Sequence, residues 1–272
     1  MGGSSTRQFA QRQSQLGIVE LKKLPSNPDY RDSHAADGYG ENYQAAFDDF
    51  PHRKYLWEIE RKLIDKIIGL HFPGKVKSLL DFACGTGRII GHVERHCEEA
   101  TGVDISESMI KVAKTRVTKA KIILADLTAD NVFEGEKFRM ITSFRFFLNA
   151  QKELRYEAME KLASLLDDDG IIVFNIHNNT SSLTNRISKL YMLLKYRKRM
   201  PVKEMSINDV KELLDTYGLE IHSLYNYATY PIFNERKKFP TKLVKSFDSF
   251  FSSVVKLPSL SRYIIYVAKK KT

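Results

Sequence analysis

The stretch Leu79-Leu80-Asp81-Phe82-Ala83-Cys84-Gly85-Thr86-Gly87-Arg88 decides the fold of this chain. It begins as an apolar, strand-like run, carries an acid near the end of that run, and continues through a Gly-x-Gly turn into a helix-like segment, 89–97. Glycines in such a turn let the backbone approach a ligand closely, and the helix start behind them has unpaired N–H groups. Nineteen residues after Gly85, a second short strand-like run ends in Asp104. That spacing suits a carboxylate that accepts hydrogen bonds from the two hydroxyls of a ribose.

A nicotinamide-dinucleotide fingerprint is the alternative interpretation of this turn. That pattern needs a glycine or alanine three residues after the second glycine, and Ile90 stands there. Asp81, just before the turn, would also repel a pyrophosphate. The turn therefore favours a cofactor without phosphates, although a strand-turn-helix without any ligand also remains open.

Strand-like and helix-like segments alternate on both sides of this turn. Apolar periodicity predicts a long helix through Leu56–Leu70, and Ser106 is suited to cap a helix over 107–117. Further helices are expected near 154–165, 183–194 and 207–217, and strands over 78–82, 99–104, 121–125, 140–144, 171–176, 219–227 and 262–269, with a turn at 168–170. This order predicts an α/β fold with a doubly wound, largely parallel sheet of seven strands.

The chain has 272 residues and a net charge of +10, which is unevenly placed. Residues 182–203 hold seven Lys/Arg and no acid, and residues 231–256 hold six Lys/Arg against two acids. Such a surplus favours an anionic substrate, nucleic acid or membrane surface, or is simply a solvated face. No apolar run is long enough to span a membrane, and two cysteines do not suggest a disulfide framework. These features predict a cytoplasmic protein.

The run Asp81 to Arg88, D-x-x-C-G-T-G-R, resembles motif I of the class I S-adenosylmethionine-dependent methyltransferases. The resemblance covers about residues 39–270 and implies a seven-stranded sheet whose last strand is antiparallel. It implies an enzyme that uses S-adenosyl-L-methionine and releases S-adenosyl-L-homocysteine. We expect an irregular or disordered tail over 1–36 and one methyltransferase domain over 37–272. That domain would have an N-terminal helical extension, and lid insertions at about 178–205 and 230–260.

The resemblance implies cofactor contacts in the loops after the first four strands. Those at the methionine end would be made by Gly85, Gly87, the backbone of Ala83, and Asp81. The ribose and adenine contacts would come from Asp104, Ile105, Met109, Asp126 and Leu127. Ser143 falls where the strand-four loop of the family passes the reactive methyl group, and Tyr43 is either an aromatic cover or a surface tyrosine.

The acceptor is less defined than the cofactor. The strand-four loop, 143–149, lacks the Asp/Asn-Pro-Pro-aromatic run of enzymes that methylate exocyclic base nitrogens. Arg145 either binds an anionic acceptor or pairs with an acid, and His177 is either a general base or a structural histidine. No metal site is expected.

We predict O-methylation of a small molecule or glycan, with an anionic nucleotide or lipid as a suitable carrier. The alternatives are an RNA methyltransferase, or a non-catalytic partner or membrane-peripheral scaffold protein.

Overall fold

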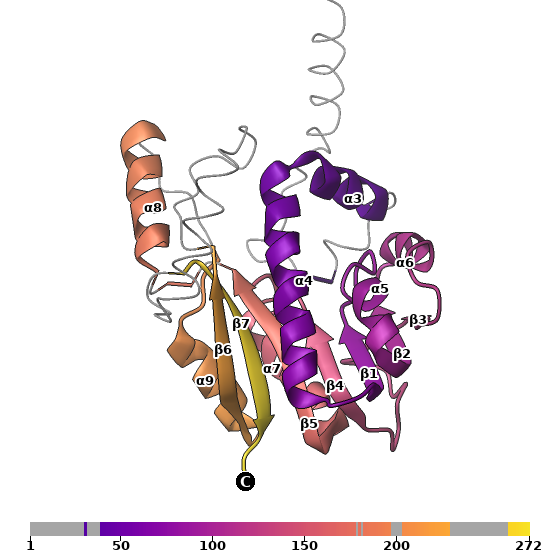
Figure 1. Ribbon diagram of the computed structural model, residues 1–272. Coiled ribbons are helices and arrows are strands. Elements are labelled where there is room, and N and C mark those ends of the chain that lie inside the picture. Colours follow the sequence, from indigo (N-terminus) through magenta and orange to yellow (C-terminus); the bar gives the residue numbers. More distant parts are fainter. Residues whose placement is uncertain (1–29, 32–38, 178, 181, 197–202, 229–260) are drawn as a thin grey trace, which may run out of the picture.

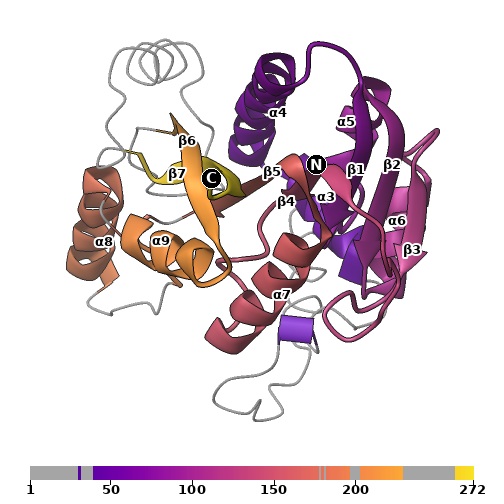
Figure 2. The ribbon, with the colours of Figure 1, turned by 90° about the horizontal axis from the view of Figure 1, so that it is seen from below.

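The computed structural model describes residues 30–31, 39–177, 179–180, 182–196, 203–228 and 261–272 (Figure 1). Within these residues a seven-stranded sheet lies at the centre and helices cover both of its faces (Figures 1 and 2). Its elements are, in chain order, α3 (Tyr39–Asp49), α4 (Pro51–His71), β1 (Val76–Phe82), α5 (Ile90–Val93), the 3₁₀ turn η1 (Glu94–His96), β2 (Cys97–Asp104), α6 (Glu107–Lys114), β3 (Lys121–Leu124), β4 (Phe138–Ser143), α7 (Lys152–Leu165), β5 (Leu166–His177), α8 (Leu183–Tyr196), α9 (Ile207–Thr216), β6 (Leu219–Tyr227) and β7 (Tyr263–Lys270).

The strand order is β3-β2-β1-β4-β5-β7-β6. Strands β1 to β5 pair in parallel, and β7 lies antiparallel between β5 and β6. The predicted doubly wound sheet with an antiparallel last strand is therefore confirmed. From β1 the chain winds outward to β2 and β3, and then returns to β4 on the other side. Such a reversal leaves a crevice beyond the carboxyl ends of β1 and β4.

Side chains along each strand point alternately to the two faces of the sheet, and they form an apolar layer on each face. Leu79 packs in a cluster with Ile64 and Ile67 of α4, whereas Leu80 packs in a second cluster with Leu162 of α7 and Leu213 of α9. Adjacent strand residues point to opposite faces, which explains why neighbouring leucines serve different layers. Figure 2 shows α4 on one face of the sheet, and α7 and α9 on the other.

Side-chain caps fix the starts of two helices. Ser106 Oγ accepts a hydrogen bond from Met109 N at 3.4 Å, which confirms the predicted cap of α6. Ser206 and Asp209 form a reciprocal capping box at the start of α9, and Gly218, with φ of 68°, follows its end. Short-range patterns were therefore sufficient to locate both helices.

Two predicted boundaries are wrong. The helix expected over 89–97 ends at His96, and Cys97 begins β2 because it pairs in parallel with Val76 of β1. The expected turn at 168–170 lies within β5, which continues through it as a bulge. Leu166 pairs with Phe138, and the next pair, Met140 with Ile171, lies two residues further along β4 but five along β5. Strand pairing overrides the helix pattern at Cys97 and the turn pattern at 168–170.

Several predicted segments lie outside the described residues. They are the lid over 230–260, residues 178, 181 and 197–202 of the lid over 178–205, and most of the 1–36 tail, of which Tyr30 and Arg31 are described as helical. Helix α8 falls inside the lid predicted over 178–205. Among the described helices, none has the length and apolar character needed to cross a membrane.

Candidate active site

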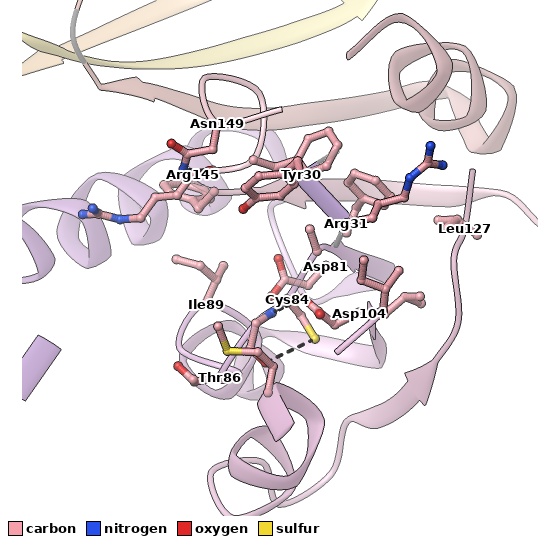
Figure 3. Close-up of a pocket in the computed structure, with 18 of the residues that line it drawn as sticks. Tyr30, Arg31, Asp81, Cys84, Thr86, Ile89, Asp104, Leu127, Arg145 and Asn149 are labelled. Atoms are coloured by element: carbon pink, nitrogen blue, oxygen red, sulfur yellow. Dashed lines mark hydrogen bonds between the residues drawn. The ribbon is translucent and has the colours of Figure 1, made fainter. Parts of the chain in front are cut away.

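A cavity of about 370 Å³ lies beyond the carboxyl ends of β1, β2 and β4 (Figure 3). Its size is in the range typical of small-molecule sites. Nine of the eleven residues expected to contact a cofactor line it: Tyr43, Asp81, Ala83, Gly85, Asp104, Ile105, Met109, Asp126 and Leu127. Arg145 lines it as well, whereas Gly87, Ser143 and His177 do not.

The two glycines of the turn have different surroundings. A Cβ on Gly85 would meet no atom within 4 Å, so this backbone is open to the cavity, and its φ of 55° is one that few other residues adopt. A Cβ on Gly87 would stand 2.9 Å from both Cα and Cβ of Ala113 on α6. Gly87 therefore permits close packing of the turn against α6. Ser143 is fully buried within β4 and does not reach the cavity.

Asp104 is held in place by backbone donors from two elements. Gly85 N donates to its Oδ2 at 2.8 Å, and Ser106 N donates to its Oδ1 at 2.9 Å. Each carboxylate oxygen can accept more than one hydrogen bond, so these contacts orient the group without exhausting it. The carboxylate is suited to receive a pair of hydroxyls.

Asp81 is almost fully buried beneath the turn. Its Oδ1 accepts from Thr142 Oγ1 at 2.7 Å, and its Oδ2 accepts from Ile90 N at 3.2 Å. Burial raises the pKa of this carboxyl to about 7, although the Thr142 hydroxyl and the Ile90 N–H oppose that shift. Near neutral pH the group is divided between its two forms, so a cation in the cavity would favour the ionised form.

Two residues of the expected tail reach the cavity and were missed by sequence reasoning. The Tyr30 ring meets Phe146 edge-on, with centroids 5.7 Å apart, and its backbone N donates to Gln151 Oε1 at 3.0 Å. Arg31 Nη1 lies 3.3 Å from Asp126 Oδ2. The other oxygen of Asp126, Oδ1, accepts from Thr128 N and Oγ1. Contacts across 95 residues leave no local signal in a sequence.

Arg145 lies across the cavity from Cys84 and Asp104, next to Asn149 (Figure 3). Its φ of 68° is rare for a residue with a side chain. Two hydrogen bonds hold this backbone: Arg145 N donates to Asn175 Oδ1 at 2.7 Å, and Asn149 Nδ2 donates to Arg145 O at 2.6 Å. The loop after β4 is thus fixed with Arg145 in the wall of the cavity, and the guanidinium extends toward Glu60 of α4 (Figure 3).

Glu60 of α4 is the buried counter-ion of two arginines. Its Oε2 accepts from Arg88 Nη1 at 2.7 Å, and its Oε1 lies 3.5 Å from Arg145 Nη2. Tyr227 OH and Asn175 Nδ2 also donate to Oε1, at 2.8 and 3.3 Å. Burial alone would raise the pKa of Glu60, but Arg88 and Arg145 outweigh it and hold that pKa below 4.5. One carboxylate balances two guanidinium groups, so this cluster has a net positive charge.

A signal for Glu60 existed in the sequence. Leu56, Glu60 and Ile64 follow one another at intervals of four, so this acid stands on the apolar face of its helix. A carboxylate in that position needs a buried partner.

His177 lies at the end of β5, stacked on Tyr263 with centroids 6.3 Å apart. Burial, followed by the charges of Arg145 and Arg262, lowers its pKa to about 3. The imidazole is therefore neutral at physiological pH and is a weak base. Its position and pKa give no support for the expected general-base role.

Lys203 brings a further cation to the cavity, from the expected lid. Its Nζ donates to Asn149 O, and burial lowers its pKa. Acids thus gather at the β1–β3 end of the cavity, and Arg145 and Lys203 belong to the opposite end. Across the described part of the chain, no group of three or more His, Cys, Asp or Glu is arranged to hold a metal ion.

Comparison with known proteins identifies a family that this chain resembles. Residues 79–170 match the family described as methyltransferase domain. An uncharacterised protein of Methanocaldococcus jannaschii is 26% identical over 89% of this chain and 93% of that protein. A dTDP-3-amino-3,4,6-trideoxy-α-D-glucopyranose N,N-dimethyltransferase of Streptomyces venezuelae is 29% identical over 36% of this chain and 42% of that enzyme. The curated relatives with methyltransferase names match over only 35–55% of their own length.

Solved structures agree on the fold. Magnesium protoporphyrin IX methyltransferase of Synechocystis, with bound S-adenosylhomocysteine, superposes with a TM-score of 0.61 and 14% identity. The superposition covers 89% of this chain and 98% of that one.

Proposed function

We propose that this chain, a class I S-adenosylmethionine-dependent methyltransferase, methylates an oxygen of a small molecule or glycan that carries an anionic group. The observation that carries the acceptor class is the net positive charge of the Glu60, Arg88 and Arg145 cluster, which reaches the cavity through its arginines. A buried surplus charge is costly, and an anionic group on the acceptor would offset that cost.

The cofactor end of the cavity fits S-adenosylmethionine. Gly85 leaves open space beside its backbone, and Asp104 has oriented oxygens for the ribose hydroxyls. Asp81, with its raised pKa, and the backbone of Ala83 would face the cationic methionine end. The adenine would lie between Ile105 and Met109, with Asp126 and Leu127 at its edge, and Tyr43 would cover the cofactor.

The bound cofactor supplies an electrophilic methyl group on a sulfonium, and the protein mainly has to align the acceptor with it. Orientation of two reactants can by itself account for a large part of the rate enhancement. Arg145 and Lys203 would hold the anionic group, and Tyr30 and Phe146 would exclude water. The acceptor proton would leave to water, because His177 does not line the cavity.

N-methylation of an amino sugar is the second candidate. Its support is the similarity to sugar-nucleotide N,N-dimethyltransferases of Streptomyces and Saccharopolyspora. A sugar nucleotide would satisfy the same basic end through its diphosphate, so the two candidates differ only in the acceptor atom.

A turnover assay with S-adenosylmethionine tests both candidates. The acceptors would be dTDP-linked sugars with and without an amino group, the same sugars without phosphate, and bulk RNA. We expect S-adenosylhomocysteine to form with the anionic sugars, and NMR of the product then distinguishes O-methyl from N-methyl. In Arg145→Gln, KM for anionic acceptors should rise about tenfold or more, because a charge-assisted contact is lost.

Arg95→Gln removes an exposed arginine remote from the cavity and serves as the matched control. Equal turnover of charged and uncharged sugars would contradict the anionic class. Turnover of RNA alone would favour the RNA methyltransferase.

A further inference from the structure

Helix α8 exposes its apolar side. Leu183, Ile187, Leu190 and Leu194 are 51%, 43%, 56% and 72% exposed. They recur at intervals of four, three and four, so they form a single stripe along the helix. Elsewhere in the described chain, only Leu70 and Leu124 are large apolar residues of comparable exposure.

The opposite side of α8 is polar and buried. Asn185 and Ser188 are nearly inaccessible to solvent. Asn185 Nδ2 donates to Asn179 O at 3.3 Å and to Glu204 Oε1 at 2.9 Å, and Lys189 pairs with the same glutamate. A surface helix normally buries its apolar stripe against the core. In α8 polar contacts attach the helix to the fold, and the apolar stripe is exposed to solvent. The helix lies at one edge of the molecule (Figures 1 and 2).

The stretch of sequence that contains this stripe has a surplus of positive charge. Residues 182–203 contain seven Lys/Arg and no acid. With 3.6 residues per turn, Arg186 falls at the margin between the stripe and the polar side. Outward leucines with a basic margin are the composition of helices that lie in the plane of a membrane surface. Lysine and arginine are attracted to the phosphates of an anionic leaflet.

We propose that α8 is a docking element for an anionic lipid surface, with Leu183, Ile187, Leu190 and Leu194 inserted at the acyl boundary. Arg186, at the margin of the stripe, would contact the lipid phosphates. Because α8 starts shortly after the carboxyl end of β5, it lies at the end of the sheet where the cavity opens. The surface would therefore lie at the same end of the sheet as the cavity. This proposal does not depend on the identity of the acceptor.

Co-sedimentation with vesicles tests this proposal. The full-length chain would be mixed with vesicles of phosphatidylcholine alone, or of phosphatidylcholine with phosphatidylglycerol. We expect binding to the anionic vesicles only, weakened by high salt. The double variant Leu190→Ser/Leu194→Ser should bind about tenfold or more weakly, because two leucines lose their insertion energy. The matched control is Leu70→Ser/Leu124→Ser, which removes two equally exposed apolar side chains from other surfaces and should bind like the wild type.

Three outcomes would overturn the proposal. Absence of binding to both kinds of vesicle is the first. The second is a lower melting temperature of Leu190→Ser/Leu194→Ser in the absence of lipid, because the stripe would then be covered by this chain itself. The third is a wild-type dimer, seen by analytical ultracentrifugation, that the same variant dissociates.

Discussion

The cavity has two ends of opposite charge, and they are built in different ways. The acidic end, with Asp81 and Asp104, is formed by short loops after β1 and β2. The basic end depends on Glu60 of α4, which reaches Arg145 after β4 and Tyr227 of β6. One end is a local motif, whereas the other is assembled from residues far apart in sequence. The acidic end can therefore form within short segments of the chain, whereas the basic end exists only once α4, β4 and β6 are packed together.

The largest effect should come from removing the counter-ion of the basic end. Glu60→Gln leaves Arg88 and Arg145 buried without a negative partner, which we expect to cost about 3–5 kcal/mol of unfolding free energy. Because the folded pKa of Glu60 lies below 4.5, this stabilisation is present above pH 4.5 and is lost as the pH falls through the folded value. Urea denaturation at neutral and acid pH measures both effects, and the two proteins should converge in acid.

Graded variants sharpen that test. Tyr227→Phe removes one hydrogen bond to Glu60 and should cost about 1 kcal/mol. Glu160→Gln, at an exposed position of α7, should be neutral. Equal stability of Glu60→Gln and the wild type would mean that the buried cluster is not an ion pair in solution.

At the acidic end, Asp104→Asn should weaken cofactor binding by about 2–4 kcal/mol. The amide loses the negative charge and presents a donor to Gly85 N–H or Ser106 N–H, which are donors themselves. Titration calorimetry with S-adenosylhomocysteine measures the loss, and Glu107→Gln, an exposed acid nearby, is the control. An unchanged Kd would contradict the assignment of Asp104 to the ribose.

Asp81 gives the cofactor end a pH dependence near neutral pH. Its pKa of about 7 falls when a cation binds beside it, so cofactor binding should release a proton below neutral pH. The affinity for S-adenosylmethionine should rise with pH, by at most about tenfold per unit below pH 7. Titration calorimetry in buffers of different ionisation enthalpy measures the number of protons released when the cofactor binds. Asp81→Asn, which keeps the shape of the side chain, should flatten the profile, and an unchanged profile would assign the titration to another group.

The two ends also differ in how far the sequence could predict them. The turn and Asp104 could be predicted because the glycines, the acids and the strand patterns occur together within a short segment. Gly87 looked equivalent to Gly85, but its neighbour is Ala113 of α6, which the motif does not reveal. Arg145 was noticed without its partner, since no pattern joins a residue of α4 to the loop after β4. The low pKa of His177 likewise arises from burial and two arginines, which exist only in the folded chain.

The smallest effect concerns the place where the N-terminal segment meets the acidic end. Arg31 and Asp126 are both about one-third exposed, at 34% and 28%, so their ion pair should contribute only about 0–1 kcal/mol. Arg31→Gln would loosen Tyr30, which forms part of the cavity wall, and should weaken cofactor affinity by no more than about fivefold. The difference should vanish at high salt, because salt screens exposed pairs. Lys152→Gln, an exposed cation on α7, should have no effect at any salt concentration. A loss far above fivefold would mean that the N-terminal segment belongs to the cofactor site itself, and the division into a local acidic end and an assembled basic end would then fail.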